Sequence, residues 1–368
     1  MSQLNPMICI AGGGTGGHVM PALALADAVR LQWSHLDVHF IGAERGLEAR
    51  LMPERGESVL LLTMHAVQGA GWLQRLRVLF WELPLAVVKI LKLWRQRKPE
   101  VLVGVGGYAS VAGVIAALLA RIPVVLYEQN AIPGLVNRLL YRFCDKMMIG
   151  FSSAEQHLPH QRKSVVTGNV VRQDFTALVY KQPKEAHLLV VGGSQGAMFL
   201  NETVPKACAM LADQGLEFKV THLVGAGEGR IEAVQMMYTQ AGIEADVQAY
   251  SAEMPALFSR ASLMIARAGA MTVCEATAAG LPTLFVPLPW AADQHQYFNA
   301  KSLVDVGAAE MVDQNTCDVE GLAKTLAATL FNQARLEHMS KQSKEVFVAN
   351  AAALQLNVLA KYLGEVKP

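Results

Sequence analysis

The chain has 368 residues, 52% of them hydrophobic, and a formal net charge of +1. This length predicts about two domains, and the near-zero charge argues against a nucleic-acid binder. The five cysteines are scattered and lack CxxC spacing, which is typical of reduced thiols in a cytoplasm rather than of a disulfide framework or a zinc site.

The first half of the chain alternates short apolar runs with segments of helical periodicity. The helical period is visible at residues 22–30 and 111–120, between runs rich in Val and Ile. Such alternation predicts βαβ units around a parallel sheet that is buried on both faces. The predicted strands are MICIA (7–11), VHFIG (38–42), VLVGVGG (101–107), PVVLYEQN (123–130), KMMIG (146–150) and SVVTGN (164–169).

The same pattern restarts in the second half, so we predict an α/β protein with two doubly wound parallel-sheet domains. We place the domains at residues 1–167 plus 344–368 and at residues 168–343, with a final helix over 343–363 that packs back on the first domain. The predicted strands of the second domain begin the segments HLLVVGGSQGA (187–197), FKVTHLVGAG (218–227), ADVQAYS (245–251), LMIARAGA (263–270) and LPTLFVPLP (281–289).

The loop AGGGTGG joins the first predicted strand to a helix. Glycines permit positive φ and close approach of a ligand, and the helix start offers unpaired N–H groups, which together favour an anion site over a purely structural turn. Gly12, Gly14 and Gly17 also match the dinucleotide pattern GxGxxG. That pattern needs an acid at the end of the second strand, whereas Asp37 precedes this strand and Glu44 follows it late.

Similar small-residue loops follow later strands, at residues 103–110, 190–197 and 266–276. Ligands of open α/β sheets bind at the carboxyl ends of the strands. We therefore predict a cleft between the two domains that is lined with anion-binding loops.

The motifs GGGTGGHVMPALALA, GVGGYAS, YEQNAIPGLVNRLL, TGNVVR, GGSQGA and ARAGAMTVCEATAAGLPTLFVPLP stand in this order over nearly the whole chain. In this respect the sequence resembles the MurG family of bacterial glycosyltransferases. The resemblance implies a GT-B fold, two Rossmann-like domains facing across a cleft, and an inverting transfer of N-acetylglucosamine (GlcNAc) from UDP-GlcNAc to the C4 hydroxyl of N-acetylmuramic acid (MurNAc) in lipid I. The product would be lipid II for peptidoglycan synthesis, a step of cell-wall biogenesis that serves cell shape and cell division.

The resemblance also implies which residues bind UDP-GlcNAc. The loop at 15–17 approaches the sugar and diphosphate, Ser251 holds the uracil through backbone groups, and the segment 270–275 wraps the diphosphate and ribose, with Glu275 on the ribose hydroxyls. Asn130 and Gln296 lie by the GlcNAc. The full implied set is Thr15, Gly16, Gly17, Asn130, Arg172, Ser194, Ser251, Ala270, Met271, Thr272, Val273, Cys274, Glu275 and Gln296.

Transfer needs a base for the attacking hydroxyl, and two residues are candidates. His18 stands where the glycine loop becomes a helix, a position that favours the neutral imidazole, although it could instead bond the loop backbone. Glu128 ends a predicted strand and could equally hydrogen-bond the turn that follows. Gly106, Gly107 and Tyr108 are candidate acceptor contacts, with core packing as the alternative for Tyr108.

No DxD triplet occurs in the sequence, so no Asp pair is expected to clamp a metal on the diphosphate. We expect no metal site and no tightly bound cofactor, and stimulation by a divalent cation stays open. Helix N-termini can stabilise the departing diphosphate instead. We expect Arg267 to form a structural ion pair.

Residues 71–99 combine three tryptophans with seven basic residues and a single acid, Glu82. This pattern fits a helix lying in an anionic membrane interface, although an ordinary amphipathic helix with Val88, Leu91 and Trp94 in the core is the simpler alternative. Because the implied acceptor is lipid-linked, we expect residues 72–98 to contact the cytoplasmic face of the bacterial plasma (inner) membrane as part of a peripheral protein. Pro84 is expected to split the helix, and the predicted docking patch is Trp72, Leu73, Leu76, Leu79 and Phe80.

No signal peptide and no membrane span are expected from the sequence. Partners among other cell-wall synthesis or division proteins stay open. Other functions are also compatible with parts of the pattern: a UDP-sugar epimerase of the same fold, an NAD-dependent oxidoreductase, and a membrane-associated scaffold that binds sugar nucleotides without turnover.

Overall fold

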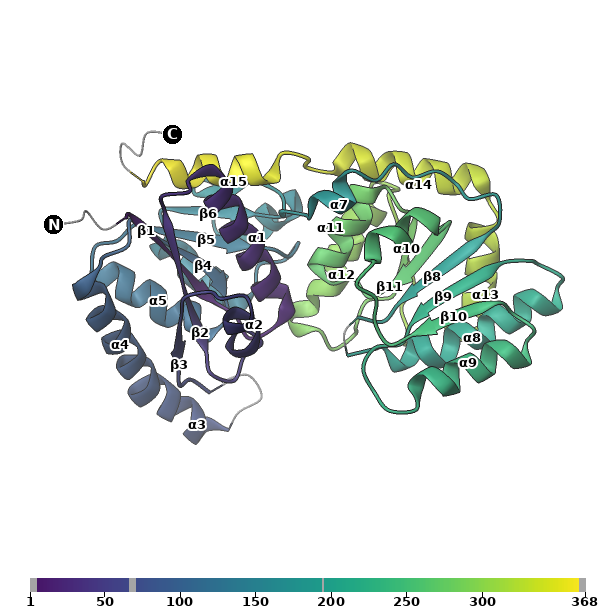
Figure 1. The fold of residues 1–368 in the computed structure, drawn as a ribbon, viewed down its shortest axis with the longest axis horizontal. Coiled ribbons are helices and arrows are strands. Elements are labelled where there is room, and N and C mark those ends of the chain that lie inside the picture. Colours follow the sequence, from purple (N-terminus) through teal and green to yellow (C-terminus); the bar gives the residue numbers. More distant parts are fainter. Residues whose placement is uncertain (1–4, 66–70, 194, 364–368) are drawn as a thin grey trace. The chain divides into compact units, whose positions relative to one another are not determined.

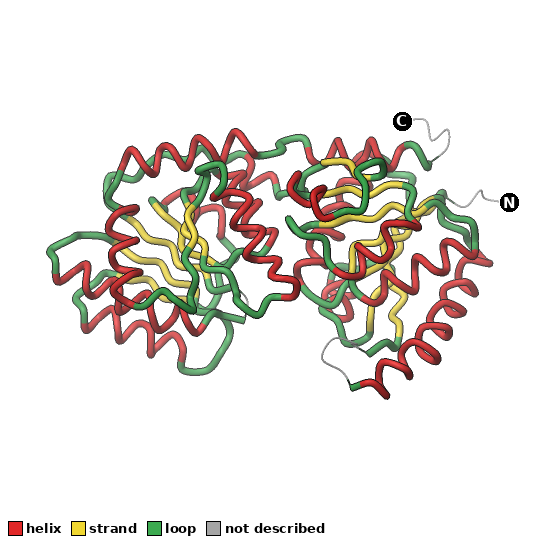
Figure 2. Tube along the Cα trace, turned by 180° about the vertical axis from the view of Figure 1, so that it is seen from behind, coloured by secondary structure: helices red, strands yellow, loops and turns green. Residues whose placement is uncertain are grey.

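The computed structural model describes residues 5–65, 71–193 and 195–363. The chain forms two compact units, an N-terminal unit of Met1–Val170 with Asn350–Pro368 and a C-terminal unit of Val171–Ala349. The boundaries lie at 170 and 349, whereas the sequence predicted 167 and 343. Figure 1 shows that each unit has a sheet flanked by helices, and Figure 2 shows the same layering from behind.

The sheet of the N-terminal unit has the order β3-β2-β1-β4-β5-β6-β7, and neighbouring strands run parallel. The central strand β4 is buried along its whole length, as expected for a parallel sheet that is covered by helices on both faces. Its elements are β1 (Met7–Gly12), α1 (Gly16–Gln32), β2 (Asp37–Ala43), α2 (Glu48–Glu54), β3 (Val59–Leu62), α3 (Trp72–Arg77), η1 (Val78–Glu82), α4 (Leu83–Gln96), β4 (Val101–Gly106), α5 (Tyr108–Leu119), β5 (Val124–Glu128), α6 (Leu135–Leu140), η2 (Tyr141–Phe143), β6 (Lys146–Ile149), η3 (Ser152–His157), β7 (Ser164–Val166) and α15 (Ala351–Ala360).

Two apolar clusters bury the two faces of this sheet. Alternate residues of β1 point to opposite faces, so that Cys9 packs with Ile90 of α4 while Ile10 packs in the cluster that contains α1 and α15. The last helix thus covers the N-terminal unit, and the side chain of Gln355 donates to the carbonyl of Gly168 at 2.8 Å. This alternation explains why the strands read as continuous apolar runs.

The sheet of the C-terminal unit has the order β10-β9-β8-β11-β12-β13 and is also parallel. Its core lies between the sheet and helices α8, α9 and α13, with Leu200, Val234 and Leu326 among the buried residues. Its elements are α7 (Gln173–Thr176), β8 (His187–Val191), α8 (Met198–Asp213), β9 (Lys219–Leu223), α9 (Arg230–Gln240), β10 (Ala245–Gln248), α10 (Met254–Arg260), β11 (Leu263–Ala266), α11 (Ala270–Ala279), β12 (Thr283–Phe285), η4 (Ala292–Gln294), α12 (His295–Val304), β13 (Glu310–Met311), α13 (Val319–Leu330) and α14 (Gln333–Val346).

Two local predictions about helices were wrong. The predicted single helix over 343–363 is the end of α14 followed by the separate α15, because Phe347 adopts an extended backbone (φ −73°, ψ 127°). Pro84 does not interrupt its helical segment. A π-helical turn, η1, precedes it, and the proline lies in the first turn of α4, where proline is tolerated.

Candidate active site

The glycine loop of the N-terminal unit links the carboxyl end of β1 to the first turn of α1. Gly12, Gly13 and Gly14 have φ values of +143°, +148° and +95°, a region that residues with a Cβ rarely adopt. Thr15 caps α1 with extended backbone, and its side chain makes no capping hydrogen bond. The predicted loop is therefore present, and its glycines are required by the backbone conformation.

A second glycine loop, between β4 and α5, meets the first at backbone contact. The amide of Gly13 donates to the carbonyl of Gly106 at 3.3 Å, and a Cβ on Gly107 would lie 2.7 Å from the carbonyl oxygen of Gly13. Tyr108 follows as the half-buried first residue of α5. Close packing of the two loops is thus one reason for these glycines, beside any ligand.

His18 is half-buried in the first turn of α1 and contacts both glycine loops. Its Nδ1 lies 3.1 Å from the carbonyl oxygen of Gly13. Because a carbonyl only accepts, Nδ1 is the nitrogen that donates this hydrogen bond. Nε2 lies next to Gly106, where a Cβ would be 2.9 Å away. The histidine therefore bonds the loop backbone through Nδ1, and among the described residues no group forms a hydrogen bond with its Nε2.

Glu128, the other candidate base, is 1% exposed and holds the turn after β5. Its Oε1 accepts from the amide and side chain of Asn130 at 2.9 and 3.0 Å, and its Oε2 accepts from Gly134 N and Asn137 Nδ2 at 3.0 and 2.9 Å. Four donors occupy the carboxylate, which is close to its capacity. This geometry favours the structural alternative, in which Glu128 orients Asn130.

In the C-terminal unit, the loop after β8 packs against the loop after β9. Gly193 and Gly196 have φ values of +81° and +74°. Arg230 Nη1 donates to the carbonyl of Gln195 at 2.8 Å and fixes the loop that leads into α8. Ser194, which is predicted to contact UDP-GlcNAc, lies outside the described residues.

Two polar side chains hold the loop between β11 and α11 in place through hydrogen bonds to backbone carbonyls. Asn299 Nδ2 donates to the carbonyl of Ala268 at 3.1 Å. Arg267 does not form the predicted ion pair with any described residue. Its Nη1 donates to the carbonyls of Val286 and Pro287 at 2.9 and 3.3 Å, and burial lowers its pKa. The loop is thus braced by hydrogen bonds to carbonyl groups.

The segment 270–275 opens α11, and only part of it is accessible. The side chains of Ala270 and Val273 are buried in the core, so they can offer a ligand only backbone groups. Burial raises the pKa of Glu275 to about 7, and the nearby charge of Arg172 opposes this rise. The Arg172 guanidinium lies 4.9 Å from the centre of the Phe175 ring. The carboxyl group of Glu275 is therefore half-buried and lies near the positive charge of Arg172.

Two further residues predicted to contact UDP-GlcNAc are Gln296, in the first turn of α12, and Ser251, in the loop before α10. Gln296 Oε1 accepts from Leu288 N at 3.0 Å, and Ser251 Oγ accepts from Glu253 N at 3.1 Å. Between them in sequence, Asp293 and Gln294 have positive φ values of 51° and 54°. Non-glycine residues in this region store strain, and such strain clusters at ligand sites.

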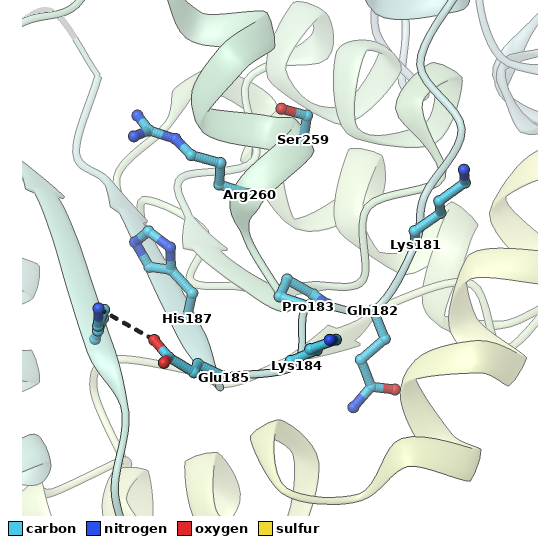
Figure 3. Close-up of a pocket in the computed structure, with 9 residues that line it drawn as sticks. Lys181, Gln182, Pro183, Lys184, Glu185, His187, Ser259 and Arg260 are labelled. Carbon is cyan, nitrogen blue, oxygen red and sulfur yellow. Dashed lines mark ion pairs between the residues drawn. The ribbon is translucent and has the colours of Figure 1, made fainter.

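A shallow hollow in the C-terminal unit lies at the other end of its sheet (Figure 3). Lys181, Lys184, His187 and Arg260 are among its lining residues, and His187 and Lys219 are the first residues of β8 and β9. The glycine loops instead follow the carboxyl ends of strands, where α/β sheets bind ligands. The hollow is therefore separate from the edge of the sheet where the glycine loops lie. Within residues 5–65, 71–193 and 195–363, no group of three or more His, Cys, Asp or Glu side chains is placed to hold a metal.

The basic-aromatic segment is apolar on its outer side. Its single acid, Glu82, is buried and pairs with His65 Nδ1 at 2.8 Å and Arg77 Nε at 3.1 Å. The core-facing alternative holds for Trp94 but not for Val88, which is 47% exposed. The predicted docking patch left out three further exposed residues, Trp81, Leu85 and Val88. Their spacing of four and three positions places them on one face of the helix. The exposed apolar residues are Trp72, Leu73, Leu76, Leu79, Phe80, Trp81, Leu85 and Val88, which we call the apolar ridge. No helix in the described part of the chain is long and apolar enough to cross a bilayer.

Two parallel α/β units with glycine loops at the carboxyl ends of their strands define a GT-B glycosyltransferase fold. Comparison with known families agrees: residues 8–149 match the glycosyltransferase family 28 N-terminal domain, and residues 187–355 match the family 28 C-terminal domain.

Named relatives narrow the class. The chain is 40% identical over 356 residues to the UDP-N-acetylglucosamine–N-acetylmuramyl-(pentapeptide) pyrophosphoryl-undecaprenol N-acetylglucosamine transferase of Anaeromyxobacter sp. (strain Fw109-5), covering 96% of this chain and 92% of that one. It is 36% identical to the transferase of the same name from Aeromonas hydrophila, covering 95% of each. The crystal structure of Acinetobacter baumannii MurG superposes with a TM-score of 0.81 at 31% identity, over 97% of this chain and 99% of that one. The chain belongs to this family of MurG N-acetylglucosamine transferases.

The epimerase alternative rests on fold alone. A UDP-N-acetylglucosamine 2-epimerase superposes with a TM-score of 0.65 at 15% identity, covering 100% of this chain and 98% of that one. Identity this low shows that the two proteins have a similar fold and says nothing of their chemistry.

Proposed function

We propose that this chain transfers GlcNAc from UDP-GlcNAc to the C4 hydroxyl of MurNAc in lipid I, with inversion at the sugar, and so makes lipid II for peptidoglycan synthesis. The observation that carries the proposal is the 40% identity, over 96% of the chain, to a protein named for this reaction. In the reaction the C4 oxygen bonds to the anomeric carbon, the bond from that carbon to the diphosphate breaks, and UDP leaves.

The C-terminal unit is the donor-binding unit in this proposal. The amides at the starts of α8 and α11 meet the diphosphate, since helix N-termini attract anions and can stabilise the charge that develops as UDP leaves. Glu275 accepts hydrogen bonds from the ribose hydroxyls, and Arg172 lies close enough to affect its charge. Gln296 reaches the GlcNAc, and Ser251 presents backbone groups to the uracil. This arrangement needs no resident cofactor, and a divalent cation would act only by pairing with the diphosphate.

The N-terminal unit supplies the base and the acceptor site. His18 is the better base because Nδ1 is held while no group of the described residues bonds Nε2, whereas the Glu128 carboxylate accepts from four donors. Glu128 positions Asn130, and the second glycine loop, with Gly106, Gly107 and Tyr108, receives the acceptor.

We further propose that the apolar ridge docks on the cytoplasmic face of the bacterial plasma membrane, where a lipid-linked acceptor would be found. Phe80 and Trp81 are 69% and 70% exposed, and the basic residues Lys89 and Lys92 follow in α4. Aromatic and apolar side chains with flanking cations are the composition that interfacial helices use.

The reaction is tested with radiolabelled UDP-GlcNAc and a lipid I analogue. Label that moves to the lipid supports the proposal. UDP-dependent isomerisation of the sugar without label on the lipid would establish the epimerase instead, and nucleotide binding without turnover would establish a scaffold.

The choice of base is tested by pH–rate profiles of His18→Ala and Glu128→Ala. We expect His18→Ala to lose at least 10²-fold in kcat together with the acidic limb of the profile. Glu128→Ala should keep that limb and fall mainly through misplacement of Asn130. The reverse pattern would assign the base to Glu128.

A further inference from the structure

Glu48, the first residue of α2, is a buried acid with no part in the proposed reaction so far. It is 1% exposed. Its Oε1 accepts from Ala43 N at 2.8 Å, and its Oε2 accepts from Gly14 N at 2.7 Å. Both oxygens act as acceptors, which is the pattern of an ionised carboxylate. Because a buried carboxylate is costly, a chain keeps one only where its hydrogen bonds compensate.

Three glycines enclose this carboxylate. A Cβ added to Gly13 or Gly46 would overlap the carboxyl group of Glu48, and a Cβ added to Gly42 would overlap its Cγ. The acid therefore sits in a cradle of its own size, between the glycine loop and the loop after β2. Its position is fixed by the backbone around it.

The peptide group between Gly13 and Gly14 forms hydrogen bonds with both Glu48 and His18. The N–H of Gly14 donates to Glu48 at 2.7 Å, and the carbonyl of Gly13, at the other end of that peptide bond, accepts from His18 Nδ1 at 3.1 Å. Hydrogen bonds in series polarise one another, so a negative charge on the N–H side makes the carbonyl a stronger acceptor.

We propose that Glu48 is a positioning residue that acts on His18 through the peptide bond between Gly13 and Gly14. It fixes the Nδ1–H tautomer, so that Nε2 is the bare nitrogen beside Gly106. When Nε2 takes the proton of the acceptor hydroxyl, the positive ring keeps its Nδ1–H bond to the polarised carbonyl. The catalytic consequence rests on the proposed function, in which His18 is the base.

The choice of acid follows from donor counting. Two N–H groups meet the side chain, and two carboxylate oxygens satisfy both. A glutamine offers one acceptor oxygen and one NH₂, which would face an N–H with another donor and leave a buried group unpaired. The amide would also lack the charge that polarises the peptide.

The test is ¹⁵N NMR of the full-length protein labelled at histidine, with His18→Ala used to assign the His18 ring signals. In the wild-type protein, at a pH where the ring is neutral, we expect Nδ1 to be protonated and Nε2 to be bare. In Glu48→Gln the share of the Nε2–H tautomer should rise, and kcat should fall about 10- to 100-fold with the KM for UDP-GlcNAc within about twofold. Glu44→Gln is the matched control, since it removes one exposed carboxylate nearby that accepts a hydrogen bond from Thr63 Oγ1 at 2.8 Å.

Two outcomes would overturn the inference. One is a wild-type ring protonated at Nε2, a result that needs no variant to fold. The other is an unchanged tautomer in folded Glu48→Gln.

A double-mutant cycle separates this inference from the proposed function. If Glu48 acts through His18, Glu48→Gln should cost little further kcat in the His18→Ala background. An equal loss in both backgrounds would contradict the relay. Full activity of His18→Ala together with a tautomer shift in Glu48→Gln would refute the base assignment and leave the relay intact.

Discussion

Donor binding should depend on pH through Glu275. Burial raises the pKa of this carboxyl group to about 7 from its ordinary value of 4.5. A ribose diol donates two hydrogen bonds and therefore binds the ionised form. Binding must first remove the proton, so the Kd should rise as pH falls below 7. At pH 6 the carboxyl group is about nine-tenths protonated, which weakens binding about tenfold relative to pH 8.

The raised pKa of Glu275 also makes the stability of the unliganded protein depend on pH. Below pH 4.5 the group is protonated in both the folded and the unfolded chain and has no effect. Above pH 7 it is ionised in both, and the folded state carries the burial cost, about 3 kcal/mol for a shift of this size. The stability that Glu275 contributes is therefore present at low pH and is lost as pH rises to 7. Glu275→Gln should gain stability relative to wild type over the same interval.

The assay is isothermal titration calorimetry with UDP-GlcNAc, without acceptor, from pH 6 to 8. UDP-GlcNAc is preferred to UDP because its diphosphate is esterified at both ends and has no terminal group that titrates near pH 6. Wild type should release close to one proton per ligand below pH 7, measured in buffers of different ionisation enthalpy. Glu275→Gln should bind more weakly at pH 8 and show a flat Kd. Glu320→Gln, which removes an exposed carboxylate paired with Lys324, should behave as wild type. A flat Kd in wild type would refute the reasoning.

Three further changes test other parts of the structure. Leu76→Glu with Phe80→Glu should lower partitioning onto anionic vesicles at least 10²-fold in a sedimentation assay, since each apolar side chain is worth about 1.5–3 kcal/mol on burial. Tyr238→Phe should cost about 1–3 kcal/mol in thermal or urea unfolding, because the buried His222, whose pKa burial lowers to about 3, stays neutral and loses the hydroxyl 3.0 Å from its Nδ1. Gly13→Ala should cost about 1–3 kcal/mol for its φ of +148°, and more for the overlap of its Cβ with a buried carboxyl group.

Controls make these outcomes decisive. Leu31→Glu introduces the same charge at a leucine that is 91% exposed on α1, and it should leave vesicle binding unchanged. Equal loss in Leu31→Glu would attribute the vesicle effect to charge alone. Wild-type stability in Tyr238→Phe would mean that water replaces the hydroxyl. Gly56→Ala, at a positive φ with open space around the Cβ, should show the conformational cost without the overlap.

The sheets could be read from sequence because parallel strands buried on both faces give apolar runs regardless of side. The glycine loops could also be found, since a strand that ends in glycines before a helix is a local pattern. Glu48 could not, because its importance comes from contact with Gly14, 34 residues earlier in the chain. The glycines at 42 and 46 that flank it were the available signal. The break between α14 and α15 was missed because residues 347–350 contain no glycine or proline that would mark the end of a helix.

The choice between His18 and Glu128 was open for the same reason. Both stand at the ends of predicted elements, and residue type alone gives either one the chemistry. What separates them is the number of donors around each group, a tertiary property. Arg267 shows the opposite error: its charge suggested an acid as partner, whereas carbonyl groups of a neighbouring loop satisfy it.

The return of α15 to the N-terminal unit affects the order in which a ribosome-bound chain can mature. Val358 and Leu359 belong to the same buried cluster as Leu23 of α1. That cluster cannot close until residues 358 and 359 have been translated, whereas every residue of the C-terminal unit has already been synthesised by then. The unit that is made first is completed last, and a nascent chain stalled before residue 350 would carry an uncovered apolar face that chaperones recognise.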